Sequence, residues 1–355
     1  MEFNNFINVG HSTLRQFGTI LILWFGDNLF HVITWFVVCY CIDIFTYIIS
    51  VIHFFPSKVI IPGFSSSVLK RNIKFASDMT LTTIFWTIYR QADKAVISKL
   101  MPIGILGYYS FALRAVSIGS SVSNAISQAA FPSFSFLIEN DKKTSIQQYK
   151  KLQDIICIGN VPILALVAFS AFPVFSYIFN KEIAAMLLLP TVFLCCGSYL
   201  YSAYRLPISY AIAMGKTEIP RNTNFFSLFV IIPLTIILIY YWGLTGAALV
   251  LICRVTFLYL YAIPKICAEC FKFSAVEWYR HLLRIFFLAI ISYGGAGFLL
   301  DMVRTISVLS LFLMYLMATS CFLIFCYFLI GNDLRESLFN HINLYRSKLA
   351  GVFSE

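Results

Sequence analysis

Long apolar runs separated by short polar clusters dominate this sequence. A helix needs roughly 20 apolar residues to cross about 30 Å of hydrocarbon, and about ten runs meet or approach that length. We expect these runs at residues 12–26, 30–53, 73–97, 104–128, 152–178, 184–212, 223–241, 243–264, 282–300 and 304–330. The pattern predicts an all-α, polytopic integral membrane protein with about ten transmembrane helices.

Composition supports this interpretation and excludes a water-soluble enzyme. Of the 355 residues, 60% are hydrophobic and 12% are charged, whereas soluble domains carry about 25% charged residues. No nucleophile-elbow, phosphate-loop or H-E-x-x-H motif is present, and the five histidines are dispersed. The Cys267–Cys270 pair has no second pair to complete a metal site. We therefore expect no enzyme activity, no cofactor and no metal.

Basic residues predict the orientation of the helices. One set of connectors and the tail, with the first turn of each following helix, holds 17 of the 26 lysines and arginines. These segments are 54–72, 137–151, 214–222, 265–281 and 331–355. The opposite side holds four: Lys94, Lys99, Lys181 and Arg304. Because basic loops stay on the cytoplasmic side, we expect the C-terminus there, and the scattered charges do not indicate nucleic-acid binding.

Two of these connectors have a mixed character. Residues 137–151 combine a charged start with a spaced apolar set, which fits an amphipathic turn on the inner leaflet or a plain solvated connector. Residues 265–281 are similar and separate the last two predicted spans from the preceding six.

Three arginines fall near the middle of predicted spans. Arg114, Arg205 and Arg254 lie on different runs, and each would cost about 2.5–3.5 kcal/mol if it faced lipid. We expect them to face a cationic cavity that receives an anionic ligand, since arginine binds phosphate and carboxylate groups bidentately. Hydrogen bonding between helices without a ligand is the alternative for each of them.

Other polar residues within the spans allow two interpretations. Arg90 and Asp93 are three residues apart, so they can form a structural ion pair on one helix face. Alternatively, Asp93 or Asp78 is a site of proton or cation coupling. Gly119, Ser123 and Ser127 form a row of small residues that favours close helix packing, with a polar cavity wall at Ser123 and Asn124 as the second interpretation.

Four short stretches, at three places in the sequence, resemble a known family. YRQAD at 89–93 followed by LGYYS at 106–110, AMGKT at 213–217, and GLTGAA at 243–248 occur in an order and spacing similar to the polysaccharide flippases of the MATE-like (MOP) superfamily. The resemblance is greatest to the Wzx type and extends over residues 12–330.

The resemblance implies a fold of two six-helix lobes around a central cavity, often followed by two further spans. Residues 1–72 then correspond to a partial N-terminal lobe of about two spans, and residues 73–264 to a complete C-terminal lobe. Residues 265–355 correspond to a connector, two extra spans and a cytoplasmic tail. The resemblance also leads us to expect that about four N-terminal helices of the family are missing from this sequence.

It also implies a function. Family members flip undecaprenyl-diphosphate-linked O-antigen units across the bacterial inner membrane by alternating access, and we expect ion coupling without ATP. Arg114, Arg205 and Arg254 would then contact the lipid-linked oligosaccharide. The implied partners are this substrate and membrane lipid, with an O-antigen polymerase and a chain-length regulator, and no nucleic acid. A multidrug or cation antiporter of the same superfamily and an O-antigen polymerase are the alternatives.

Overall fold

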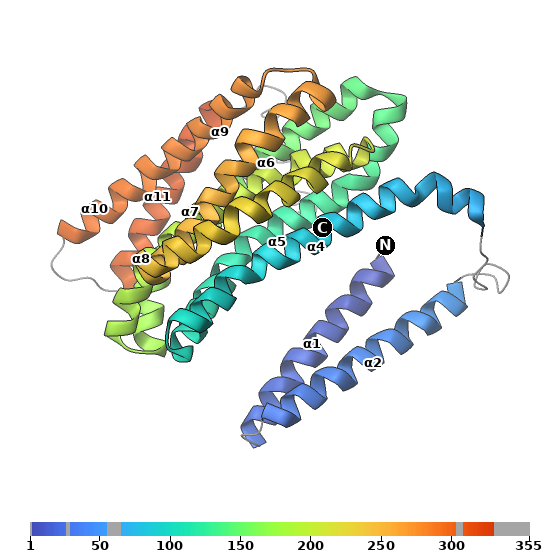
Figure 1. Ribbon diagram of the computed structural model, residues 1–355. Helices are drawn as coiled ribbons and strands as arrows, with labels where there is room; N and C mark the ends of the chain where they lie inside the picture. The colour runs from blue at the N-terminus through green and yellow to red at the C-terminus, as the bar shows by residue number, and fades with distance from the viewer. Residues whose placement is uncertain (1, 26–28, 55–64, 303–307, 330–355) are drawn as a thin grey trace, which may run out of the picture. The chain divides into compact units, whose positions relative to one another are not determined.

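The computed structural model describes residues 2–25, 29–54, 65–302 and 308–329, and in these ranges the chain is helical without any strand (Figure 1). The α-helices are α1 (Glu2–Phe25), α2 (Leu29–Phe54), α4 (Ser66–Leu100), α5 (Ile103–Asn140), α6 (Lys142–Ile178), α7 (Lys181–Ala213), α8 (Glu218–Ile266), α9 (Ala275–Ala289), α10 (Gly295–Met302) and α11 (Val308–Leu329). Two π-helical turns, Cys267–Phe271 and Ile290–Gly294, follow α8 and α9. The predicted all-α class is confirmed.

Two compact units make up the chain, Met1–Arg71 and Asn72–Glu355. In the first unit α1 and α2 form an antiparallel pair. Trp35 Nε1 donates a hydrogen bond to the Arg15 carbonyl at 3.3 Å, and His11 Nδ1 lies 2.7 Å from Asp43 Oδ1. The assignment of residues 1–72, 73–264 and 265–355 to parts of a two-lobe transporter stays a prediction.

The second unit is built around α6 and α7. Helices α5 and α8 pack on α7, α5 also packs on α6, and α9 and α11 pack on α6. Figure 1 shows α4–α8 as long helices lying alongside one another. The core between them is aromatic: Tyr109, Tyr149, Tyr210, Phe134 and Phe175 are among its fully buried side chains.

Large apolar side chains also cover the surface of the protein. Phe25 is 86% exposed and Tyr177 is 92% exposed, which would be unfavourable in water. Among the described residues, six helices are long and apolar enough to cross a membrane. They are Phe30–His53, Lys142–Ile178, Lys181–Ala213, Glu218–Phe271, Ala275–Leu299 and Leu309–Phe328. The protein is therefore a polytopic membrane protein.

Helix α8 accounts for two of the predicted spans. Gly243 has a non-helical backbone with φ 54° and ψ −131°. A β-carbon on Gly246 would lie 1.9 Å from the Leu238 carbonyl oxygen, although eight residues of a straight helix cover about 12 Å. The chain therefore turns back at Gly243, between the predicted spans 223–241 and 243–264.

The two connectors of mixed character, 137–151 and 265–281, contain fewer non-helical residues than the sequence predicted. Between α5 and α6 only Asp141 is non-helical, so residues 137–151 extend the two helices instead of forming a separate turn or loop. Between α8 and α9 the non-helical segment is Lys272–Ser274, because a π-helical turn continues α8. Local capping explains the first sharp corner: the Asp141 carboxylate accepts hydrogen bonds from the backbone N–H groups of Lys143 and Thr144.

Several predictions fall outside the described residues. Residues 331–355, predicted as the cytoplasmic tail, belong to this part, as do residues 55–64 of the first basic connector and Arg304. The orientation of the protein in the membrane stays a prediction.

Candidate functional site

Arg205 of α7 and Arg254 of α8 share one aromatic neighbour. The guanidinium carbons of Arg254 and Arg205 lie 5.1 Å and 5.5 Å from the ring centre of Tyr201. Arg254 also lies 5.3 Å from the ring centre of Tyr89 of α4. Each contact is a cation–π interaction, worth about 0.5–2 kcal/mol according to its exposure. Two of the three predicted arginines therefore meet, although 49 positions separate them in the sequence.

A third arginine belongs to the same group. Arg90 of α4 lies 4.5 Å from the ring centre of Trp86, and Tyr201 interacts electrostatically with all three guanidinium groups. We call this group the arginine–aromatic cluster, and its members are Trp86, Tyr89, Arg90, Tyr201, Arg205 and Arg254.

Amide side chains hold the cluster in place. Arg205 Nε donates a hydrogen bond to Asn124 Oδ1 of α5. Tyr89 donates its hydroxyl hydrogen to Asn224 Oδ1 at 3.1 Å, and Asn224 Nδ2 donates to the Thr82 carbonyl at 3.1 Å. These bonds connect α4, α5, α7 and α8, so the positions of the arginines depend on the packing of four helices.

The row of small residues on α5 contributes to this packing. Ser123 is fully buried and accepts a hydrogen bond from Asn160 Nδ2 of α6. A β-carbon on Gly119 would lie 2.7 Å from the Leu164 side chain, so a larger residue there would displace Leu164 and loosen the contact between α5 and α6. Ser123 therefore has the predicted packing role, whereas its neighbour Asn124 contacts the cluster.

Within the described part of the chain, ion pairs do not neutralise the positive charge of the cluster. Over the described ranges, no carboxylate oxygen lies within 4.0 Å of a guanidinium nitrogen of Arg90, Arg205 or Arg254. The Nε atom of Arg254 is buried and has no hydrogen-bond partner there. A buried donor without a partner costs about 1–3 kcal/mol, so this site is suited to an anionic ligand or to water that the ligand displaces.

The cluster lies deep within the helices. Arg90 is ten residues from Leu100 at the end of α4, and Arg254 is eleven residues from the turn at Gly243. At about 1.5 Å per residue these positions are about 15–17 Å from those helix ends. Among the described residues α8 meets the length and hydropathy expected of a membrane-spanning helix, whereas α4 does not. The membrane depth of Arg254 stays a prediction.

Asp93 lies beside the cluster but does not pair with Arg90. Tyr109 donates its hydroxyl hydrogen to Asp93 Oδ2 at 3.4 Å, and the Lys94 backbone N–H donates to Asp93 Oδ1 at 2.8 Å. Arg254 is an electrostatic neighbour of this carboxylate. The predicted Arg90–Asp93 ion pair is wrong, because Arg90 is directed to Trp86 instead. Asp93 stays a candidate for ion coupling.

Asp78 lies in a different part of α4. Its side chain is buried and forms an ion pair with Arg221, and Thr217 donates a hydroxyl hydrogen to it at 3.0 Å. Fifteen residues separate Asp78 from Asp93, which corresponds to about 22 Å along a helix. The two predicted coupling residues therefore do not form one site, and Asp78 has a structural partner at the start of α8.

Arg114 is not part of the cluster. It is exposed on α5, eleven residues from Ile103, and forms no ion pair with any described carboxylate. Among the described residues α5 is not one of the six helices apolar enough to cross a membrane, but an arginine that faced lipid at this position would be costly. This face of α5 is thus expected to meet water or another protein surface, and Arg114 stays a candidate for the substrate path.

The aromatic members of the cluster were missed by sequence reasoning. Trp86 and Tyr89 are two of many aromatic side chains in apolar runs, where they usually pack against neighbouring helices. Spacing is the available signal, since Trp86 precedes Arg90 by four positions and Tyr201 precedes Arg205 by four positions, which places each pair on one helix face. No comparable local signal marks Tyr201 as the neighbour of Arg254.

A large apolar hollow lies elsewhere in the same unit. Its volume is about 680 Å³, and α6, α7, the α9–α10 segment and α11 line it with side chains that include Phe169, Tyr199 and Tyr293. None of its lining residues is charged. We therefore place the candidate site at the arginine–aromatic cluster, where polar recognition chemistry is available.

Comparison with known proteins defines the class further. The chain is a helical membrane protein, and the profile of a family described as "Polysaccharide biosynthesis protein" matches residues 6–188, just over half of the 355 residues. The chain belongs to this family. The description of this family agrees with the resemblance to polysaccharide flippases.

A curated relative agrees with this class. The chain is 25% identical over 189 residues to an "Uncharacterized membrane protein in cps region" of Klebsiella pneumoniae. The aligned segment covers 52% of this chain and 38% of the relative, so the chain matches well under half of the relative's length. No solved structure matches the chain.

Proposed function

We propose that this chain is part of a flippase that moves undecaprenyl-diphosphate-linked O-antigen oligosaccharides across the bacterial inner membrane. The observation that carries the proposal is the arginine–aromatic cluster, with three arginines free of ion pairs to the described carboxylates at mid-helix depth. A diphosphate linked to a lipid is an anionic group that must pass this depth. Guanidinium groups bind phosphate oxygens through paired hydrogen bonds and stay charged in an apolar environment.

The cluster would bind the diphosphate rather than the polyprenyl tail. The unpartnered Nε of Arg254 offers a buried donor, and the phosphate oxygens would supply its acceptor. The tail would stay in lipid, since the outer faces of the helices are apolar. Rocking of two lobes would then expose the headgroup to the other side of the membrane, as in alternating-access transporters.

Ion coupling is part of the same proposal. Asp93 is the acidic side chain beside Arg254, and protonation of Asp93 would raise the net positive charge around the diphosphate. Asp78 is a weaker candidate, because it already forms an ion pair with Arg221. The proposal assigns no catalytic residue, cofactor or metal, and it places the C-terminus in the cytoplasm. An O-antigen polymerase and a chain-length regulator would be partners of the whole protein.

The charge of the cluster argues against the cation antiporter. Such a transporter needs excess acidic side chains around its ligand, whereas the cluster contains three arginines and Asp93 is an electrostatic neighbour of one of them, Arg254. The polymerase alternative has no specific observation in its favour.

Substrate binding and movement can be measured with the purified chain. We would titrate it in detergent with a fluorescent undecaprenyl-diphosphate oligosaccharide, and then follow dithionite bleaching of the same lipid in proteoliposomes. Removal of one charge-assisted hydrogen bond costs about 1.5–3 kcal/mol, so Arg205→Gln and Arg254→Gln are each expected to weaken binding about 10-fold to 100-fold. Lys99→Gln, an exposed cation at the end of α4, is the matched control and should bind normally.

Two further comparisons make the test specific. Undecaprenyl monophosphate should bind more weakly than the diphosphate, and an organic cation should not compete. Unchanged diphosphate binding by both cluster variants would disprove the assignment of the site. Binding without bleaching of the inner-leaflet lipid would contradict flipping by this chain. Arg114→Gln then tests whether the exposed face of α5 belongs to the substrate path.

A further inference from the structure

Helix α9 has one face fixed against α6. Trp278 Nε1 donates a hydrogen bond to the Tyr149 hydroxyl at 3.0 Å, and His281 Nε2 lies 2.7 Å from Asp154 Oδ1. Leu282 is buried on the same face of α9. These contacts set the rotation of α9 about its axis, so they also decide which side chains lie on its other face.

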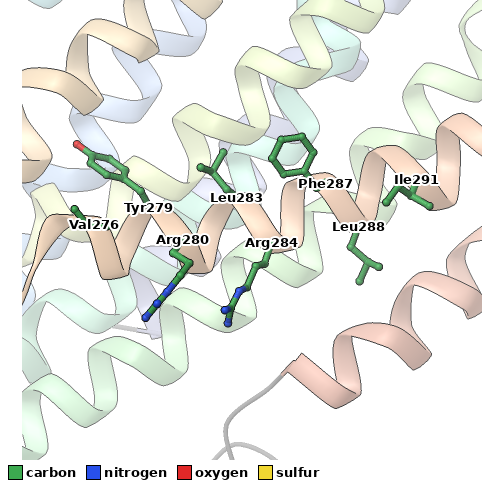
Figure 2. A pocket seen from close by; sticks show the side chains of 8 residues that line it. All are labelled: Val276, Tyr279, Arg280, Leu283, Arg284, Phe287, Leu288 and Ile291. Carbon is green, nitrogen blue, oxygen red and sulfur yellow. The ribbon is translucent and has the colours of Figure 1, made fainter.

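The other face combines two arginines with an apolar row. Arg280 and Arg284 are exposed one helical turn apart, and Figure 2 shows both side chains leaving α9 on the same side. Leu283, Phe287 and Ile291 follow along the helix with exposed fractions of 45%, 57% and 71%. These side chains line a surface hollow of about 720 Å³ (Figure 2).

The two arginines have no partner of opposite charge in the described part of the chain. Neither forms an ion pair with a carboxylate within 4.0 Å, although Glu277 lies three positions before Arg280 on the same helix. Two exposed lysines, Lys265 and Lys272, lie shortly before α9 in the chain. The charge at this end of α9 is therefore suited to an anion from outside the chain.

We propose that this face of α9 binds an anionic phospholipid, with the headgroup phosphate on Arg280 and Arg284 and an acyl chain along Leu283, Phe287 and Ile291. Guanidinium forks match phosphate oxygens, and basic residues beside membrane helices attract anionic headgroups. The seven residues from Arg284 to Ile291 cover about 10 Å of helix, which fits within the roughly 15 Å depth of one leaflet.

Charge selects this occupant over a second copy of the chain. If two copies met through this face, four arginines would lie together against only two Glu277 carboxylates, and excess like charge at an interface is unfavourable. A free phosphate ion would leave the apolar row uncovered. An anionic phospholipid satisfies both parts of the surface, and it is independent of the substrate proposed above, which concerns a different set of helices.

Lipid selectivity can be measured by native mass spectrometry. The full chain would be released from nanodiscs that contain phosphatidylglycerol and phosphatidylcholine in equal amounts, and the retained lipids counted. Two arginines near a headgroup correspond to about a 30-fold preference for the anionic lipid. We expect the double variant Arg280→Gln/Arg284→Gln to lose most of this preference. The matched control Lys70→Gln/Arg71→Gln removes two exposed cations from α4 and should keep it.

The possible outcomes separate the explanations. Loss of phosphatidylglycerol enrichment in the α9 variant alone, with unchanged thermal unfolding, supports the proposal. Equal enrichment in all three proteins overturns it, as does equal retention of the two lipids by the wild type. Release of a lipid-free dimer that the α9 variant cannot form would show that a second copy covers this face, and would also overturn it. If the phospholipid proposal for α9 is overturned, the proposal that the arginine–aromatic cluster binds the diphosphate is unaffected.

Discussion

The ion pair between Arg221 and Asp78 connects the start of α8 to α4, and its two members are unequally buried. Asp78 is 1% exposed, whereas the side chain of Arg221 is 32% exposed. Thr217 also donates to Asp78 at 3.0 Å, and Arg221 has a second partner in Asn222 at 3.0–3.1 Å. We expect the two single substitutions to have different costs, because only one of them leaves a buried charge.

The expected losses in free energy of unfolding follow from the unequal burial of Asp78 and Arg221. Removal of one partner from a buried ion pair costs about 3–5 kcal/mol, and we expect Arg221→Met in this range, since Thr217 is the remaining described donor to the Asp78 carboxylate. Asp78→Asn should cost about 1–2 kcal/mol, because the arginine keeps Asn222 and reaches solvent. The double variant Asp78→Leu/Arg221→Met should be less destabilised than Arg221→Met alone, since neither charge then remains.

Unfolding of the purified chain in mixed micelles of mild detergent and dodecyl sulfate, followed by circular dichroism, gives the required free energies. Lys99→Met provides the control, because it removes an exposed cation from the other end of α4 and should change stability by less than about 0.5 kcal/mol. If Asp78→Asn proved as costly as Arg221→Met, or if the costs simply added in the double variant, the argument from unequal burial would be refuted.

Three further outcomes are expected. Gly246→Ala should destabilise the protein by about 1–3 kcal/mol or more, because its β-carbon would meet the Leu238 carbonyl at 1.9 Å. Hydrogen bonds from Thr144 lower the pKa of Asp141, so its stabilisation of α6 is present above the ordinary carboxyl pKa and is lost on acidification through the lowered value. The hydrogen bond to Glu269 raises the pKa of Lys216, so this contribution is lost only as the pH rises through the raised value.

Each of these has its own measurement and control. Gly104→Ala is the control for Gly246→Ala, since nothing lies within 4 Å of a β-carbon on Gly104. Equal unfolding midpoints for the two variants would contradict the turn in α8. For Asp141, the stability difference between wild type and Asp141→Ala should shrink below about pH 4. For Lys216, an amine titration by nuclear magnetic resonance should move back toward the ordinary lysine value in Glu269→Gln.

Much of the fold could be predicted because it depends on local hydropathy. Each long apolar run must satisfy its own backbone hydrogen bonds in lipid, so it becomes a helix whatever its neighbours are. The turn at Gly243 was predictable for a similar local reason, since glycine adopts positive φ without strain. The connectors were less predictable. Residues 137–151 are polar enough for a loop, but Asp141 caps α6 directly after α5 ends.

The candidate site could be predicted only in part. The cost of a charge in lipid identified Arg205 and Arg254 as inward-facing residues, and cation–π contacts in the structure bring both to Tyr201. The same reasoning could not distinguish Arg114 from these two arginines, although Arg114 is exposed on α5 and is not part of the cluster. Nor could it show that Asp78 pairs with Arg221, a residue 143 positions away.

The sequence by itself thus determined that this chain is a membrane protein of long helices, and it nominated the residues too costly to face lipid. Both conclusions rest on transfer energies, which depend on the side chain and its immediate neighbours in the chain. The tertiary structure decided which arginines share an aromatic environment, which carboxylates are already paired, and which face of α9 presents Arg280 and Arg284. These facts depend on how each helix is rotated against its neighbours, and that rotation is set by packing between distant parts of the chain.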